Sequence, residues 1–216
     1  ALQDEMAKLS DDCAGYSDAD LSDPKAIDEM VALCTNELGS PSILVNNAGI
    51  QHVAPVDDFP PEKWDAILAI TLSAVFHTTR LCLPSMRQRG WGRIINTASA
   101  HSIVASPNKS AYVAAKHGVI GLTRALALEL AKQHLTVNAV CPGYTETDIA
   151  AGAVADLVQK KGKTPEQARA LLAARNPQQR MIQPDEVAQT VVWLCQRASG
   201  GINGQALALD GGELAG

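Results

Sequence analysis

Short apolar runs alternate along the chain with longer helical patterns. The apolar runs predict strands at residues 43–45, 92–98, 135–140 and 206–209. The longer patterns predict helices at residues 62–89, 110–133 and 184–196. Ser110 has the side chain of an N-cap and is expected to begin the middle helix.

This alternation predicts an α/β fold with a doubly wound, Rossmann-like parallel sheet covered by helices on both faces. We expect one domain over residues 1–216, with no linker or repeat. Residues 148–183 interrupt the pattern, because two short polar helices are expected on either side of residues 162–165. Such a segment between strands is typical of a lid over a site.

Composition narrows the class of protein. Hydrophobic residues make up 46% of the chain and aromatic residues 4%, which suits buried strands under alanine-rich helices. The net charge of −5 argues against nucleic acid as a partner. The chain has no unbroken run of about 18 apolar residues and no signal-peptide pattern, so we expect no membrane partner and a cytoplasmic location. The spacing of its five cysteines and five histidines predicts free thiols and no metal site.

The chemistry is expected where strands end, because ligands of an open parallel sheet bind beyond the carboxyl ends of its strands. Tyr112 and Lys116 are one helical turn apart and share a helix face. A nearby ammonium group stabilises a phenolate and would lower the pKa of Tyr112, which makes proton exchange with an alcohol feasible. Ser99 ends a predicted strand and is placed to hydrogen-bond the substrate oxygen. The candidate segments are residues 46–51, 99–102 and 141–147.

Six motifs follow one another in a familiar order: Asp20-Leu21, Asn46-Asn47-Ala48-Gly49, Ser99, Tyr112-x-x-x-Lys116, Pro142-Gly143 with Thr147, and Asp210-Gly211-Gly212. With them the chain resembles the short-chain dehydrogenase/reductase family over essentially its whole length. The resemblance implies hydride transfer between the nicotinamide of NAD or NADP and a secondary alcohol or ketone.

The resemblance also implies roles for single residues. Tyr112 would be the general acid and base, Ser99 would orient the substrate oxygen, and Lys116 would bind the nicotinamide ribose. The resemblance slightly favours NAD, although the residues that normally discriminate NAD from NADP would precede residue 1. The residues implied to contact the cofactor are Asp20, Leu21, Asn46, Ala48, Gly49, Tyr112, Lys116, Pro142, Gly143, Thr145 and Thr147.

Two features depart from the family pattern. The glycine-rich turn and its strand, expected ahead of Asp20, are absent, so we expect the working protein to be longer than this chain and to supply the first strands of the sheet. Thr71 stands where the family usually has an Asn that takes part in a proton relay beyond the lysine. Either that relay is rebuilt around Thr71 or turnover is reduced.

Three polar residues near the expected site are unnecessary for hydride transfer. Gln51, His101 and Lys109 offer several hydrogen-bond donors that suit a carboxylate. The alternative interpretation is that they are ordinary loop residues. The sequence around them is similar to that of the 3-hydroxybutyrate dehydrogenases of the family, although Tyr144 stands where those enzymes usually have Trp. The lid sequence is more like that of 3-oxoacyl-thioester reductases. The expected substrate is therefore a small 3-hydroxy or 3-oxo compound, bound in part by Tyr144.

Two hypotheses remain open at the level of the whole chain. The first is a dehydrogenase or reductase, favoured by the intact Ser99, Tyr112 and Lys116. The second is a catalytically impaired family member that serves as a binding or assembly subunit, favoured by Thr71 and the missing turn. The resemblance implies a homotetramer formed through the two long helices, predicted at 62–89 and 110–133, and through the C-terminal segment. The sequence itself shows only that these helices carry wide apolar surfaces. The apolar residues in question include Leu122, Leu126, Leu128 and Leu130.

Overall fold

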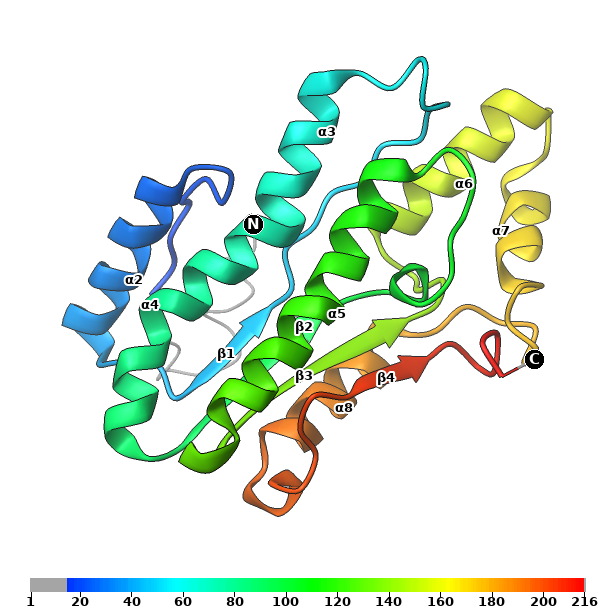
Figure 1. Cartoon of the computed structure of the whole chain (residues 1–216). Helices are drawn as coiled ribbons and strands as arrows, with labels where there is room; N and C mark the ends of the chain where they lie inside the picture. Colours follow the sequence, from blue (N-terminus) through cyan, green and yellow to red (C-terminus); the bar gives the residue numbers. More distant parts are fainter. Residues whose placement is uncertain (1–14, 216) are drawn as a thin grey trace.

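The computed structural model describes residues 15–215 and contains a four-stranded parallel sheet in the order β1-β2-β3-β4. Figure 1 shows the sheet with helices on both faces. The fold is thus the α/β parallel sheet that the sequence predicted. The strands are β1 (Ile43–Asn46), β2 (Gly92–Thr97), β3 (Leu135–Pro142) and β4 (Ala206–Leu209). The helices are α2 (Pro24–Leu38), α3 (Pro61–Leu68), α4 (Ala74–Arg89), α5 (Ser110–Leu130), α6 (Asp148–Lys161), α7 (Pro165–Ala173) and α8 (Pro184–Cys195).

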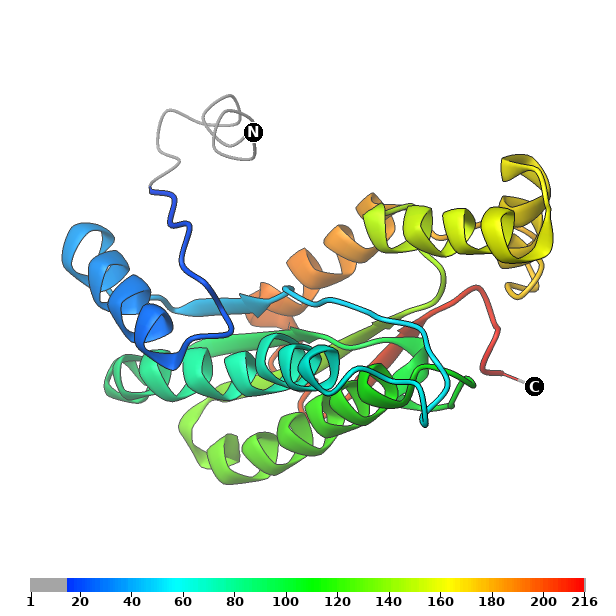
Figure 2. The same ribbon diagram turned by 90° about the horizontal axis from the view of Figure 1, so that it is seen from above.

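The two central strands form the core because both of their faces are covered (Figure 2). Every residue of β2 and β3 is buried except the last one of each. On the face of α4 and α5, Ile94 and Val137 pack against Met86 and Leu130. On the opposite face, Ile95 and Val140 pack against Leu194 of α8 and its neighbours. Continuous β-branched and apolar strands of this kind are stable only between two helical layers.

Strand β1 lies at an edge of the described sheet. Its pairing with β2 runs from Ile43 opposite Arg93 to Asn46 opposite Asn96. Ile43 is 40% exposed and Val45 is 43% exposed. Within the described residues, these β-branched side chains are therefore only partly buried, as is common on an edge strand.

The predicted helix 62–89 is interrupted by a π-helical turn, Ala69–Ser73, between α3 and α4. Thr71 lies in this turn and is 1% exposed. The turn also brings Leu72 against Gly118 of α5, where an added Cβ would lie 2.8 Å from the Leu72 side chain. The small residues around Tyr112 and Lys116 thus allow a close helix contact.

The helix-start prediction at Ser110 is wrong by one residue. Lys109 occupies the N-cap position of α5 and Ser110 is the first helical residue. The Ser110 hydroxyl is buried and has no partner among the described residues. Helix α2 was not predicted individually; it is amphipathic, but only Ile27 of it is buried.

The run Pro61–Arg89, with a mean hydropathy of 1.6 in its most apolar window, is long and apolar enough to cross a membrane by length and composition alone. Polar residues interrupt this run, so the chain still has no unbroken stretch of about 18 apolar residues. The run packs on α2, α5 and the sheet, and 44% of the window is buried, as in a core helix. The expected lack of a membrane partner stays a prediction.

Four cysteines are free thiols in the structure: Cys34, Cys82, Cys141 and Cys195. Cys13 lies outside the described residues. Within residues 15–215, no three His, Cys, Asp or Glu side chains are grouped so that they could hold a metal ion.

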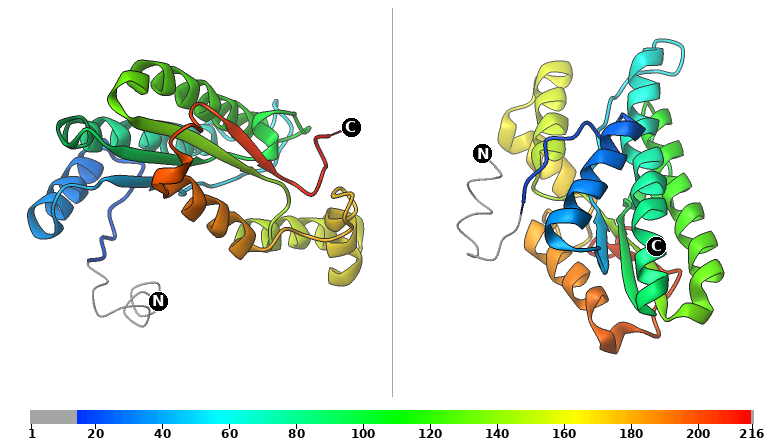
Figure 3. Two further views of the ribbon diagram at one scale, coloured as in Figure 1. Left: turned by 90° about the horizontal axis from the view of Figure 1, so that it is seen from below. Right: turned by 90° about the vertical axis from the view of Figure 1, so that its left-hand side faces the viewer.

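Helices α6 and α7 form the expected lid segment, which extends beyond the carboxyl end of the sheet (Figure 3). Gly162 ends α6 in a left-handed conformation, at a φ of 59° that favours glycine. Thr164 then caps α7 and exchanges hydrogen bonds with Gln167 in a capping box. Two short helices on either side of residues 162–165 are thereby confirmed.

Candidate active site

A cavity of about 860 Å³ opens at the carboxyl ends of the strands. Its walls come from the turns that follow β1, β2 and β3, from the start of α5, and from α6 and α8. All three segments that the sequence pointed to contribute residues to it. The volume lies within the usual range for sites that bind small molecules or cofactors.

Tyr112 and Lys116 face this cavity from the first turns of α5. The Lys116 ammonium lies 5.6 Å from the centre of the Tyr112 ring, as expected for positions i and i+4. Ser99 follows β2 and hydrogen-bonds the Tyr112 phenol. Tyr112 is 8% exposed and Ser99 is 7% exposed. The structure therefore brings together the trio that the sequence proposed.

Burial is the largest influence on the pKa values of Tyr112 and Lys116. It raises the pKa of Tyr112, which the hydrogen bond from Ser99 partly offsets and the nearby Tyr144 reinforces. Burial also lowers the pKa of Lys116 to about 8. The predicted lowering of the Tyr112 pKa is wrong in direction, because desolvating a phenolate outweighs the stabilising contacts around it. Tyr112 is a protonated acid at neutral pH.

The groove beside Lys116 fits a nicotinamide nucleoside. Lys116 is 3% exposed, and its ammonium donates one hydrogen bond of 2.5 Å to the carbonyl oxygen of Thr97. Its other donors face the groove beside Gly49, where an added Cβ would lie 3.6 Å from the ammonium. A buried ammonium needs further acceptors, which ribose hydroxyls would provide. The cavity wall here includes the predicted cofactor residues Ala48, Gly49, Pro142, Gly143, Thr145 and Thr147.

The predicted substrate residues Gln51, His101, Lys109 and Tyr144 line the same cavity. The Lys109 ammonium is 3.5 Å from the Tyr144 hydroxyl and 5.4 Å from the centre of its ring. Burial lowers the pKa of Lys109, and repulsion from Arg175 lowers it further. No carboxylate in residues 15–215 forms an ion pair with Lys109. The more distant Glu213 carboxylate acts in the opposite direction and raises the pKa of Lys109. A mostly buried cation with no carboxylate in direct contact is suited to an anionic ligand.

Both ring nitrogens of His101 lie within hydrogen-bond distance of a serine hydroxyl. Nε2 is 2.7 Å from the Ser106 hydroxyl, and Nδ1 is 3.4 Å from the Ser99 hydroxyl. Burial lowers its pKa to about 4, with repulsion from Lys109 and Arg175 adding to the effect. His101 is therefore neutral near pH 7 and acts through hydrogen bonds.

Sequence reasoning missed two residues at this end of the cavity. Arg175 follows helix α7, and its guanidinium carbon lies 5.9 Å from the centre of the Tyr144 ring. Its guanidinium is 4.0 Å from the carboxylate of Glu213, which lines the cavity. Glu213 directly follows the Asp210-Gly211-Gly212 motif, so that motif was the available signal; nothing in the sequence singled out Arg175.

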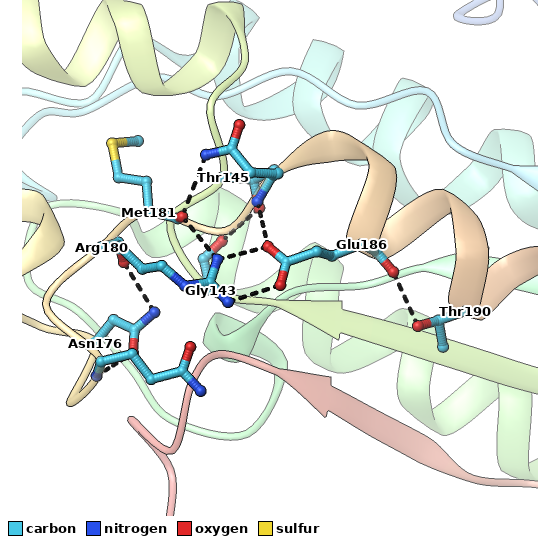
Figure 4. Close-up of polar contacts among 9 residues, drawn as sticks. Gly143, Thr145, Asn176, Arg180, Met181, Glu186 and Thr190 are labelled. Atoms are coloured by element: carbon cyan, nitrogen blue, oxygen red, sulfur yellow. Dashed lines mark hydrogen bonds and ion pairs between the residues drawn. The ribbon is translucent and has the colours of Figure 1, made fainter.

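The two ends of the lid are fastened to the rest of the site (Figure 4). Arg180 forms two hydrogen bonds to Glu186 at the start of α8, at 2.6 and 2.7 Å. Thr145 and Ile182 form a β-bridge that joins the segment before the lid to the segment after it. Asn176 donates to the carbonyl oxygen of Arg180 at 2.8 Å and packs against Gly211. The lid helices lie between these anchors.

Four predicted site residues do not line the cavity. The side chain of Asn46 is turned into the core, where it bonds Asn96 at 2.9 Å and Thr78 at 2.7 Å. Asp20 caps its own loop through Ser22, and Leu21 lies beside it. Thr71 lies behind Gly49 and accepts a hydrogen bond of 3.4 Å from the backbone of Ile50. The cofactor roles of Asp20, Leu21 and Asn46, and the relay role of Thr71, stay predictions.

The chain is similar to known oxidoreductases over most of its length. A family model described as Enoyl-(Acyl carrier protein) reductase matches residues 1–213. D-beta-hydroxybutyrate dehydrogenase of Cupriavidus necator is 48% identical over 93% of this chain and 78% of its own length. The enzyme of the same name from Rhizobium meliloti is 44% identical over 99% of this chain and 83% of its own length. Among solved structures, a variant of actinorhodin polyketide ketoreductase with NADPH superposes with a TM-score of 0.86 at 36% identity, covering 90% of this chain and 76% of the other.

Proposed function

The chain belongs to the short-chain dehydrogenase/reductase family, and on that premise we propose that it interconverts D-3-hydroxybutyrate and acetoacetate with NAD. The family and its relatives identify it as an NAD(P)-dependent oxidoreductase acting on a CH–OH group. The choice of a free 3-hydroxy acid as substrate, and of NAD over NADP, goes beyond that assignment.

The trio supplies the proton chemistry of this reaction. A bound nicotinamide supplies or accepts the hydride at the carbinol carbon of the substrate. In reduction, the Tyr112 hydroxyl donates its proton to the substrate oxygen as negative charge develops there; in oxidation the same atom takes the proton back. The Ser99 hydroxyl, which also bonds Tyr112, is placed to stabilise that oxygen. Lys116, fixed by its hydrogen bond to the Thr97 carbonyl oxygen, would hold the ribose of the cofactor.

The observation that carries the choice of substrate is the unpaired Lys109. Lys109 is 9% exposed and lines the catalytic cavity. Its ammonium lies 3.5 Å from the Tyr144 hydroxyl and contacts no carboxylate within residues 15–215. The carboxylate of a 3-hydroxy acid would supply the direct ionic contact that Glu213 does not make, at a fixed distance from the reacting carbon. Gln51 and the neutral His101 would add hydrogen bonds to the same group.

A 3-oxoacyl thioester is the competing substrate, because the lid sequence resembles that of thioester reductases. A thioester carbonyl has no negative charge to pair with Lys109. The two candidates therefore differ in how strongly they depend on this ammonium.

The test compares kcat/KM for D-3-hydroxybutyrate and for a 3-hydroxybutyryl thioester in the wild type and in Lys109→Met. We expect the free acid to be preferred, and Lys109→Met to raise its KM by about tenfold to a hundredfold, the typical value of a lost charged hydrogen bond. The thioester should lose little. Lys109→Arg is the matched control and should retain most of the affinity for the acid. A preference for the thioester, or equal losses for both substrates in Lys109→Met, would contradict the proposal.

The proposed preference for NAD is tested separately by comparing kcat/KM for NAD and NADP at saturating D-3-hydroxybutyrate. A higher value with NADP would refute that part alone.

A further inference from the structure

A second cavity, of about 460 Å³, opens at the other end of the sheet. It lies where β2 and β3 begin, beside the last residues of α4 and of α8, whereas the catalytic cavity lies where these strands finish (Figure 1). Its lining is strongly basic and contains no carboxylate: Arg89, Gly90, Trp91, Arg93, His134, Arg197 and Gly200.

Arg93 is the buried cation of this cavity. It is 3% exposed, and its Nη1 donates to the carbonyl oxygens of Gly92 at 3.0 Å and His134 at 3.3 Å. Its Nη2 reaches the carbonyl oxygen of Gln196 at 3.5 Å. Its Nε is buried and has no partner within residues 15–215, where no carboxylate pairs with Arg93 either. Carbonyl oxygens fix the guanidinium in place but do not neutralise its charge.

Trp91 lies between two arginines. The guanidinium carbons of Arg93 and Arg197 are 4.9 and 5.4 Å from the centre of its ring. The two charges repel each other, which adds to the effect of burial in lowering the pKa of Arg93. The indole Nε1 of Trp91 is also buried and, in the described part of the chain, has no hydrogen-bond partner. The cavity thus brings two arginines to one indole ring, with no carboxylate in its lining.

We propose that this cavity is a binding site for a phosphate-class anion. A tetrahedral dianion accepts hydrogen bonds from several directions at once, which suits a lining that contains three arginines and no carboxylate. It would also offset the repulsion between the two arginines. The cavity is larger than one phosphate, so either inorganic phosphate or a small phosphomonoester fits the same chemistry.

The test follows the fluorescence of Trp91 while inorganic phosphate is titrated at constant ionic strength. A saturable change is expected in the wild-type chain. It should disappear in Trp91→Phe, which retains Trp64 and Trp193 as emitters that do not line this cavity. A change that does not saturate, or that persists in Trp91→Phe, would overturn the proposal.

Exposed Arg197 allows a test that does not endanger folding. Arg197→Gln should raise the half-saturating phosphate concentration about tenfold, through the loss of one charged hydrogen bond, and leave the dehydrogenase rate unchanged. The matched control is Arg124→Gln, which removes an exposed charge that forms no ion pair within residues 15–215. If both variants raise the half-saturating phosphate concentration equally, phosphate binding depends only on the overall surface charge and the proposed site is refuted.

Two further titrations identify the occupant. Glycerol 3-phosphate binding more tightly than inorganic phosphate would support a phosphomonoester, and equal or weaker binding would support free phosphate. Acetate should bind far more weakly than either, since it carries one charge and a planar pair of oxygens. Acetate saturating the Trp91 signal at the same concentration as phosphate would exclude the phosphate class.

Discussion

Tyr112 and Tyr144 are two phenols in one cavity with different expected roles. Tyr112 hydrogen-bonds Ser99 and lies beside Lys116, whereas the Tyr144 hydroxyl meets Lys109. Tyr112→Phe should lower kcat by about 10² to 10⁴, the usual value of a general acid or base, with an unchanged circular dichroism spectrum.

Tyr144→Phe is the matched control for this experiment. It removes a hydroxyl from the same cavity and should act mainly on KM for the carboxylate substrate. Steady-state kinetics with both substrates and both variants distinguish the two roles. Wild-type turnover in Tyr112→Phe would contradict the mechanism.

His101 gives the folded protein a predictable weakness in acid. Its pKa falls from 6.5 to about 4 on folding, so between these values the unfolded chain binds more protons than the folded one. The free energy of unfolding therefore falls as the pH is lowered from 6.5 to 4, by on the order of 3 kcal/mol from this residue. Urea unfolding at several pH values should show a shallower loss in His101→Gln than in the wild type.

The exposed His117 provides the control for the acid effect. His117→Gln should keep the wild-type pH dependence, because its ring is not buried. Parallel curves for the wild type and His101→Gln between pH 4 and 6.5 would show that His101 does not carry the effect.

The lid helices α6 and α7 depend on a contact between the segment that follows them and the C-terminal loop. Gly211 has a φ of 65°, and an added Cβ would lie 1.9 Å from the Asn176 side-chain oxygen. Gly211→Ala should therefore displace Asn176 and lower both Tm and kcat/KM, since Glu213 and the lid line the cavity.

A substitution at Gly212 distinguishes backbone strain from the clash with Asn176 as the cause of that loss. The φ of Gly212 is 97°, so Gly212→Ala is also strained, but its Cβ would lie 3.6 Å from Pro177, at an ordinary contact distance. Thermal unfolding should show a smaller loss in Gly212→Ala than in Gly211→Ala. Equal losses would mean that backbone strain alone matters and that the Asn176 contact does not hold the lid.

The elements that periodicity predicted well are those with one clear environment. β2 and β3 are buried on both faces; they begin where the sequence predicted and end within two residues of the predicted ends. The long helix 62–89 was predicted in extent but not in form, because a π-turn changes the hydrogen-bond register without changing the apolar pattern. Helix α2 was missed although its apolar residues share one face; of these only Ile27 is buried.

The site was predictable where spacing along one element fixes geometry. Tyr112 and Lys116 share a helix face whatever the rest of the fold does. Arg175 meets Tyr144 and Glu213 only through the return of the lid, so no local pattern marks it. For Asn46 the motif predicts a place in the cofactor groove, whereas alternation along β1 turns its side chain toward Asn96 and Thr78, so its cofactor role stays a prediction.

At the scale of the whole molecule, only part of the apolar helix surface remains for assembly. Of the leucines expected to drive it, Leu130 is buried and Leu122 and Leu126 pack on the core, while Leu128 is 83% exposed. Phe76 is 49% exposed on the neighbouring helix, α4. Helices α4 and α5 are joined by the Arg87–Glu129 ion pair at 2.7 Å, so the two apolar side chains belong to one helical layer.

A charge introduced into the α4–α5 layer should weaken the proposed homotetramer. Leu128→Glu places a charge on an apolar surface that would be buried between copies, so sedimentation at micromolar concentration should show a smaller species than for the wild type. Val56→Glu is the control, because Val56 is 78% exposed in the loop before α3 and should leave the assembly intact. If both variants sediment as the wild type does, the α4–α5 layer is not the interface. If Val56→Glu alone dissociates the assembly, the copies meet through the loop that borders the catalytic cavity at Gln51, and substrate binding would depend on assembly.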